Sequence, residues 1–157
     1  MEPETLNLPV LALRGLTVFP HTNLTFDVER HISMKALEVA METGQEIFLV
    51  TQREINVEKP TEQDLYAIGT ISRVTQILRL GQNSLRVMVE GGRRARLKRL
   101  WQLEPYLQGQ VETAEEPESV NHGPKTEALL RQTWSLFQDY AQLAGNVAEE
   151  VIAAALD

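Results

Sequence analysis

The residue types that most often do chemistry are present in this sequence, but their spacing is not that of a catalytic centre. His21, His31 and His122 are scattered along the chain, without the i, i+4 pairing of a zinc site on a helix. The chain has no cysteine, so it can form neither a disulfide nor a thiolate metal site. The acidic pairs 115–116 and 149–150 are adjacent residues, whose side chains point apart in a helix or strand. We therefore expect no metal site and no acid–base pair.

A nucleotide-binding loop is also missing from the sequence. A P-loop needs the pattern Gly-x-x-x-x-Gly-Lys-Ser/Thr, in which backbone amides surround the phosphates and the lysine and hydroxyl serve phosphate and magnesium. No glycine of this chain is followed by lysine. We expect neither a catalytic residue nor a cofactor site in this chain.

The basic segment 93–101 is the strongest charged candidate. Arg94, Arg96 and Lys98 share one face by the period of two, so they could pair with successive phosphates while Trp101 stacks on a base. The alternative is a solvated edge strand whose like charges oppose aggregation. The formal net charge is -7, from 22 acidic and 15 basic residues, and this opposes general attraction to nucleic acid. RNA binding by a compact barrel is thus the second interpretation.

A second candidate surface is apolar. Phe19 and Pro20 lie at a turn, Leu80 ends the hairpin stem 77–80, and Met88 lies in the returning strand. A receptor for unfolded polypeptide needs adaptable apolar area, which the flexible, polarizable methionine side chain supplies. We expect Phe19, Pro20, Leu80 and Met88 to line a substrate-binding patch. The alternative is that these side chains fill the core.

The elements that must position these residues are short strands around one helix. The pattern predicts strands over 8–13, 24–29, 46–52, 66–80, 85–90 and 93–101, with a helix over 33–41. Ser33 is the expected N-cap of the helix, and Gly69 is the expected site of a bend or bulge. The turn 81–84 predicts a hairpin, and Gly91-Gly92 is expected to separate the last two strands. The predicted fold is α+β, a small, partly closed, PUA-like β-barrel.

The composition changes at 112–123, where glutamates mix with proline, serine, asparagine and glycine. We expect a barrel-like domain over 1–113, a linker over 114–123 and a helical subdomain over 124–157. Apolar residues at three- and four-residue steps from Leu130 predict an amphipathic helix that ends at Gly145, and Asn146 is expected to start a second helix. We expect Trp134, Phe137 and Tyr140 to pack within one subunit. The alternatives are packing on a continuation of the chain or on a neighbouring subunit.

Five blocks of sequence, in order, resemble the Lon family of ATP-dependent proteases. The blocks are Leu8–Arg14 leading into Leu16–His21, Ile47–Arg53, Pro60-Thr61 with Asp64–Tyr66, Ile68–Thr70, and Leu85–Gly91. Gly15 departs from the family pattern, which more often has an acidic or polar residue after Arg14. The resemblance extends more loosely over 124–157, where it implies the start of a truncated helical subdomain that opens with a helical hairpin.

The resemblance implies an amino-terminal domain that captures unfolded, damaged or degron-bearing proteins and supports assembly. ATP hydrolysis with magnesium, and peptide cleavage by a Ser-Lys pair, belong to later domains of that family. The nucleophile is therefore not expected among Ser33, Ser72, Ser84, Ser119 and Ser135. In the family the full-length protein is a homohexamer, whereas this fragment is expected to be monomeric if the ATPase contacts hold the ring. A stand-alone Lon-like adaptor is the other alternative.

The start of the chain predicts its location. Its first four residues, Met1–Glu4, are acidic where a secretory signal is basic, and no apolar segment of about 18 residues follows. We expect a cytoplasmic protein with no membrane partner.

Overall fold

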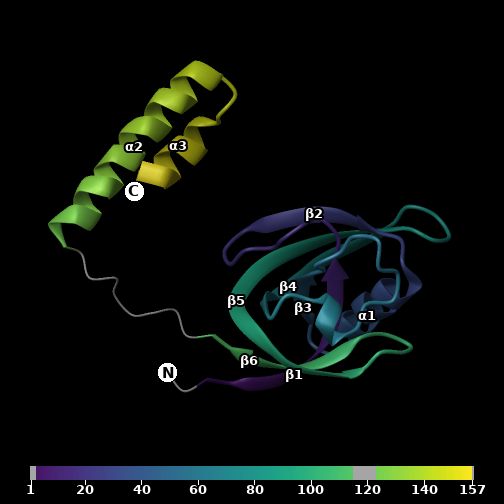
Figure 1. The fold of residues 1–157 in the computed structure, drawn as a ribbon. Coiled ribbons are helices and arrows are strands. Elements are labelled where there is room, and N and C mark those ends of the chain that lie inside the picture. The colour runs from purple at the N-terminus through teal and green to yellow at the C-terminus, as the bar shows by residue number, and fades with distance from the viewer. Residues whose placement is uncertain (1–2, 115–122, 157) are drawn as a thin grey trace. The chain divides into compact units, whose positions relative to one another are not determined.

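The apolar run 47–50 forms the centre of the sheet, as its sequence predicts. Strand β3 (Glu46–Thr51) pairs in parallel with β1 (Thr5–Leu13) and antiparallel with β4 (Ile68–Arg79). Residues 47–50 are at most 1% exposed, because β3 has a strand on each edge and apolar side chains on each face. The computed structural model describes residues 3–114 and 123–156, in two compact units, Met1–Glu115 and Glu116–Asp157 (Figure 1).

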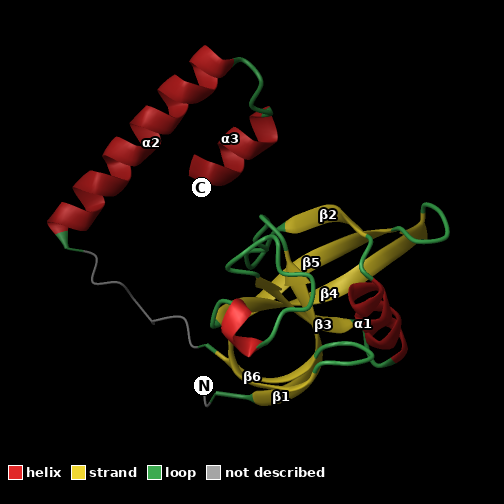
Figure 2. Cartoon of the chain, turned by 45° about the vertical axis from the view of Figure 1, so that its right-hand side comes forward, coloured by secondary structure: helices red, strands yellow, loops and turns green. Residues whose placement is uncertain are grey.

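The sheet curves until its last strand meets its longest one. Strand β5 (Leu85–Gln102) pairs with β4 and also with β6 (Gln108–Thr113), and β6 pairs in turn with β1. Strands β1, β3, β4, β5 and β6 are therefore connected in a ring of pairings, visible in Figure 2. Strand β2 (Asn23–Val28) pairs with β5 outside this ring. The first unit is a mixed six-stranded sheet with a short helix, and it is not a regular barrel.

The predicted interruption at Gly91-Gly92 is wrong. Strand β5 runs without a break through both glycines for 18 residues. Its first half pairs with β2 and its second half with β6, while β4 accompanies most of its length. The register between β5 and β4 shifts between Ile71 and Ser72. Such an irregularity lets a strand bend, so β5 can pair with β2 in its first half and with β6 in its second half.

Gly69 has a different role from the predicted bulge. It pairs regularly with Ala95, and the irregularities lie instead at 71–72 and 74–76. A Cβ atom at Gly69 would stand 2.4 Å from the Leu49 carbonyl oxygen and 2.6 Å from the Phe48 ring. The position therefore lacks a side chain because the core strand approaches it closely.

Helix α1 (His31–Glu42) begins two residues earlier than predicted. Its N-cap is Arg30, with no side-chain capping bond, whereas Ser33 lies in the first turn and is 4% exposed. Leu37 and Ala40 are buried on the predicted face, but Met41 is 37% exposed. An apolar pattern locates the buried face of a helix more reliably than its first residue.

Two apolar clusters stabilise the sheet, one on each of its faces. Ile47 and Leu49 join the cluster that includes Leu37 of α1, and Phe48 and Val50 join the other. The side chains of β3 alternate between the two because successive residues of a strand point to opposite faces. In β2 the predicted alternation is confirmed as well: Leu24, Phe26 and Val28 pack against the first cluster.

The second unit contains two helices, α2 (Pro124–Ala144) and α3 (Glu149–Leu156). Gly145 ends α2 in the left-handed conformation, with φ of 65°, as predicted. Helix α3 begins at Glu149 instead of Asn146. Ala141 of the predicted apolar face of α2 is buried, whereas Tyr140, which is expected to pack, is 60% exposed. No described helix has the length and hydropathy to cross a membrane.

Candidate functional site

Three apolar side chains share the outer face of the β4–β5 hairpin. Met88 lies opposite Gln76, and Leu78 lies opposite Arg86 one step nearer the turn. Leu80 lies directly after the end of β4 at Arg79, and it continues the period of two from Leu78. We call Leu78, Leu80 and Met88 the hairpin patch; their exposed fractions are 46%, 50% and 39%. The turn that ends this hairpin is closed by a hydrogen bond from the Leu80 amide to the Ser84 carbonyl oxygen, at 3.0 Å.

Ile77 and Leu78 are adjacent in the hairpin stem, but their side chains point to opposite faces of the sheet. Ile77 lies opposite Val87 and packs against the first cluster, the one that includes Leu37, so it belongs to the core. Leu78 points to the other face and joins Leu80 and Met88. Leu78 is therefore a surface residue that the expected patch of Phe19, Pro20, Leu80 and Met88 did not include, although the period of two in the stem would have identified it.

Phe19 and Pro20 come from the loop between β1 and β2. Phe19 is 56% exposed and Pro20 is half-buried. The loop is held against the middle of β5, since the His21 amide donates to the Gly91 carbonyl oxygen and the Gly91 amide to Thr22, both at 2.8 Å. Gly91 lies three residues beyond Met88 along β5. The structure thus places Phe19 and Pro20 beside the same strand as Met88, whereas the hairpin patch lies toward the turn.

An ion pair on β2 and β5 adjoins the hairpin patch. Arg86 donates from Nε to Asp27 Oδ1 at 2.7 Å and from Nη2 to Asp27 Oδ2 at 2.9 Å. These hydrogen bonds, opposed by desolvation and aided by the charge of Arg86, lower the pKa of the Asp27 carboxyl. The outer face therefore carries apolar side chains beside a neutralised pair of charges.

The lowered pKa of Asp27 predicts a pH-dependent contribution to stability. The contribution is present above the unfolded value of about 3.9 and is lost as the pH falls through the lowered folded pKa. Urea unfolding from pH 7 to pH 2 should show the wild type more stable than Asp27→Asn above pH 4. The two proteins should converge below the folded pKa of Asp27. A stability difference that stayed constant down to pH 2 would contradict this assignment.

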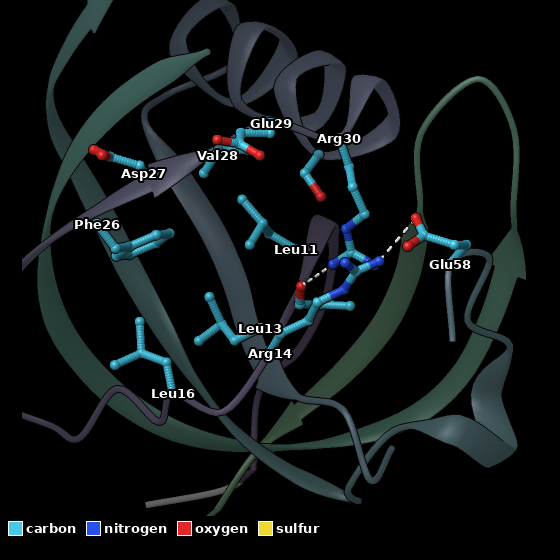
Figure 3. Close-up of a pocket in the computed structure, with 12 residues that line it drawn as sticks. Leu11, Leu13, Arg14, Leu16, Phe26, Asp27, Val28, Glu29, Arg30 and Glu58 are labelled. Carbon is cyan, nitrogen blue, oxygen red and sulfur yellow. Dashed lines mark hydrogen bonds and ion pairs between the residues drawn. The ribbon is translucent and has the colours of Figure 1, made fainter. Parts of the chain in front are cut away.

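A pocket of about 610 Å³ opens on another part of the first unit, between the end of β1, strand β2 and the start of α1 (Figure 3). Leu13, Leu16 and Phe26 supply an apolar wall, and the opposite side carries Arg14 and Arg30. Sequence reasoning missed this pocket, because its lining comes from segments that are separated in the chain.

The two arginines of the pocket are held differently. Arg30 donates to the Gln52 side-chain oxygen at 2.6 Å and to the carbonyl oxygen of Ala12. Burial lowers the pKa of the Arg30 guanidinium, and the nearby charge of Arg14 lowers it further. Arg14 forms an ion pair with Glu58 at 2.9 Å, and the Glu58 side chain is 74% exposed. Arg30 is thus a fixed charge, whereas the partner of Arg14 lies at the surface.

The basic segment does not meet the condition that RNA binding requires, which is a face clear of acidic groups. Arg96 lies directly opposite Glu112 of β6, and Lys98 forms an ion pair with Glu112 at 3.4 Å. Ala95 and Arg96 pair with both β4 and β6, so the expected edge strand is wrong here: this part of β5 is internal. Arg94 also has an interaction partner.

The two histidines that the structure describes belong to different segments of the first unit. His21 lies in the loop before β2 and His31 is the first residue of α1, while His122 and the pair 115–116 lie outside the described residues. Within 3–114 and 123–156, no group of three His, Asp or Glu residues is placed to hold a metal ion.

Exposed apolar side chains on a sheet face, together with a lined pocket, are typical of the class of domains that bind other molecules through their surface. Comparison with known families gives the particular class. The family described as the ATP-dependent protease La (LON) substrate-binding domain matches residues 7–157. The chain belongs to this family, which confirms the resemblance found in the sequence.

Individual proteins with similar sequences indicate the same family. The chain is 38% identical over 152 residues to a Lon protease of Desulforamulus reducens, covering 97% of this chain and 18% of that protein. It is 37% identical over 154 residues to a Lon protease of Clostridioides difficile, covering 96% of this chain and 19% of that protein. The chain therefore spans about a fifth of the length of these relatives.

Solved structures share the fold. The N-terminal domain of a Mycobacterium avium complex Lon protease matches with a TM-score of 0.70 at 20% identity, covering 96% of this chain and 74% of that chain. A Lon N-terminal domain protein from Xanthomonas campestris matches with a TM-score of 0.61 at 18% identity, covering 83% and 72%.

Proposed function

We propose that this domain captures unfolded, damaged or degron-bearing polypeptides through the hairpin patch, with Phe19 and Pro20 as a second part of the surface. The observation that carries the proposal is the exposure of Leu78, Leu80 and Met88 on one face of β4–β5, in a domain of the substrate-binding family. Unfolded polypeptides present apolar side chains without fixed geometry, so an adaptable apolar surface suits them better than a rigid polar site.

The proposal extends to the longer protein of which the matched relatives are examples. The captured polypeptide would pass to an ATP- and magnesium-dependent unfoldase and then to a Ser-Lys protease, in a cytoplasmic homohexamer. Single contacts of low affinity are sufficient in such an assembly, because several linked domains raise the effective concentration for one flexible polypeptide. The domain would also support assembly.

The first test replaces two exposed residues of the hairpin patch. We expect Leu80→Gln/Met88→Gln to weaken binding of a permanently unfolded, fluorescently labelled polypeptide about 10-fold, equal to about 1.4 kcal/mol. The physical reason is loss of apolar contact area on a surface that is half-exposed before binding. Fluorescence anisotropy measures the affinity, and the folded form of the same polypeptide serves as the negative probe.

The matched control replaces two apolar residues of similar exposure elsewhere. Ile55 and Ile68 are 57% and 41% exposed, so Ile55→Gln/Ile68→Gln removes comparable apolar area away from the hairpin patch. This control should bind the unfolded polypeptide as the wild type does. Equal losses in the two double variants would remove the patch from the proposal, and thermal unfolding of each variant separates lost binding from lost folding.

A further inference from the structure

The pocket between β1, β2 and α1 has an apolar side and a cationic side. Its apolar wall of Leu13, Leu16 and Phe26 faces the guanidinium groups of Arg14 and Arg30 (Figure 3). Guanidinium groups bind carboxylates through charge-assisted hydrogen bonds, and an adjoining apolar wall accepts an aliphatic side chain. We propose that this pocket binds a carboxylate with an adjacent apolar side chain, as at the C-terminus of a polypeptide.

Arg30 is preorganised for such a ligand. Its hydrogen bonds to Ala12 and Gln52 orient the guanidinium before any ligand arrives, which reduces the conformational entropy lost on binding. Both of these partners are neutral oxygen atoms, and the charge of the nearby Glu58 carboxylate also acts on Arg30. A ligand carboxylate would therefore meet an oriented guanidinium whose competing anion is Glu58.

Ser33 adds a polar group to the same pocket. It lines the pocket near Arg30 and is 4% exposed. Its hydroxyl makes no hydrogen bond among residues 3–114. Every fully enclosed side-chain polar atom of that region has a hydrogen-bond partner, so the Ser33 hydroxyl is not fully enclosed and is accessible from the pocket that it lines. Helix α1 begins here without an acidic residue in its first turn, and the positive end of its dipole also favours an anion.

Three acidic residues also line the pocket, and each affects the binding of an anion differently. Asp27 is neutralised by its two hydrogen bonds with Arg86. Glu29 lies beside Val28 near the start of α1 in Figure 3, so it disfavours an anion at that end of the pocket. Glu58 pairs with Arg14 from an exposed position, and it occupies Arg14 until a ligand carboxylate displaces it.

This inference rests on the proposed function, because it assigns a second feature of the captured polypeptide, at a different surface from the hairpin patch. The two proposals can fail separately. Binding of an unfolded polypeptide tests Leu80 and Met88, whereas a short peptide with a defined end tests Arg14 and Glu58.

The test uses a fluorescein-labelled hexapeptide that ends in leucine, either as the free acid or as the C-terminal amide. We expect the free acid to bind about 10-fold more tightly than the amide, the effect of one charge-assisted contact of about 1.4 kcal/mol. Arg14→Gln should reduce the preference to about two- to three-fold, because Arg30 remains, and Glu58→Gln should tighten binding of the free acid two- to five-fold, because the internal competitor is removed. An amidated peptide with aspartate beside the leucine tests a side-chain carboxylate as the source.

Arg99→Gln is the matched control, since Arg99 is exposed on β5 outside the pocket and its replacement changes the net charge equally. It should leave the preference for the free acid unchanged. The inference is overturned if acid and amide bind equally, if Arg14→Gln behaves like Arg99→Gln, or if Glu58→Gln weakens binding. Competition by inorganic phosphate at the same concentration as the free acid would also overturn it, because the pocket would then be a general anion site.

Discussion

Replacing Gly91 by alanine is expected to destabilise the first unit by about 3 kcal/mol, near the upper end for an overpacked site. The added Cβ would stand 2.0 Å from the Phe19 carbonyl oxygen and 3.3 Å from that of Thr22. The obstacle is backbone, which cannot rotate away as a flexible side chain can. The loop must therefore move, and the hydrogen bonds that join His21 and Thr22 to Gly91 must lengthen or break.

Urea unfolding followed by circular dichroism measures this loss, and amide NMR shifts at 19–22 show whether the loop moves. Gly81→Ala is the matched control, because a Cβ at Gly81 meets nothing within 4 Å. Its stability should stay within about 0.5 kcal/mol of the wild type, as for most surface substitutions. A Gly91→Ala protein as stable as this control, with unchanged shifts, would show that the loop is not clamped against β5.

Replacing Phe48 by alanine is expected to cost about 4 kcal/mol, the usual range for deleting a buried phenylalanine ring. Phe48 is fully buried in the second cluster, where its ring lies against the backbone of Gly69. Removing the ring leaves a cavity that strands β3 and β4 cannot close, since their register is held by hydrogen bonds along both backbones.

Phe19→Ala provides the comparison, because it deletes the same ring from a residue that is 56% exposed. We expect this variant to lose less than about 0.5 kcal/mol of unfolding free energy. Thermal and urea unfolding of both variants give the two values. A large loss in Phe19→Ala would assign Phe19 to the core and remove it from the proposed binding surface.

Exposure separates the residues that stabilise this domain from those proposed to bind. Ile77 and Leu78 are adjacent in sequence, but only Ile77 packs against the first cluster. A polar substitution at Leu78 should therefore alter binding more than stability. The proposed patch can change without loss of the fold, because Leu78, Leu80 and Met88 belong to neither apolar cluster.

Features that depend on neighbouring residues were predictable. The alternation over 24–28, the buried run 47–50, the turn 81–84 and the helix stop at Gly145 are all confirmed. Each follows from the period of a strand or from the backbone freedom of one glycine, which act over a few residues. The ordered blocks of sequence were likewise sufficient to identify the family.

Features that depend on distant segments were decided only by the tertiary structure. The sequence alone could not show that β5 continues through Gly91-Gly92, or that Glu112 lies beside Arg96 and Lys98. It also could not show that Arg14, Arg30 and Glu58 meet at one pocket. Which segments become neighbours depends on the packing and hydrogen bonding of the whole sheet. The local periodicity of a segment does not specify the segment with which it pairs.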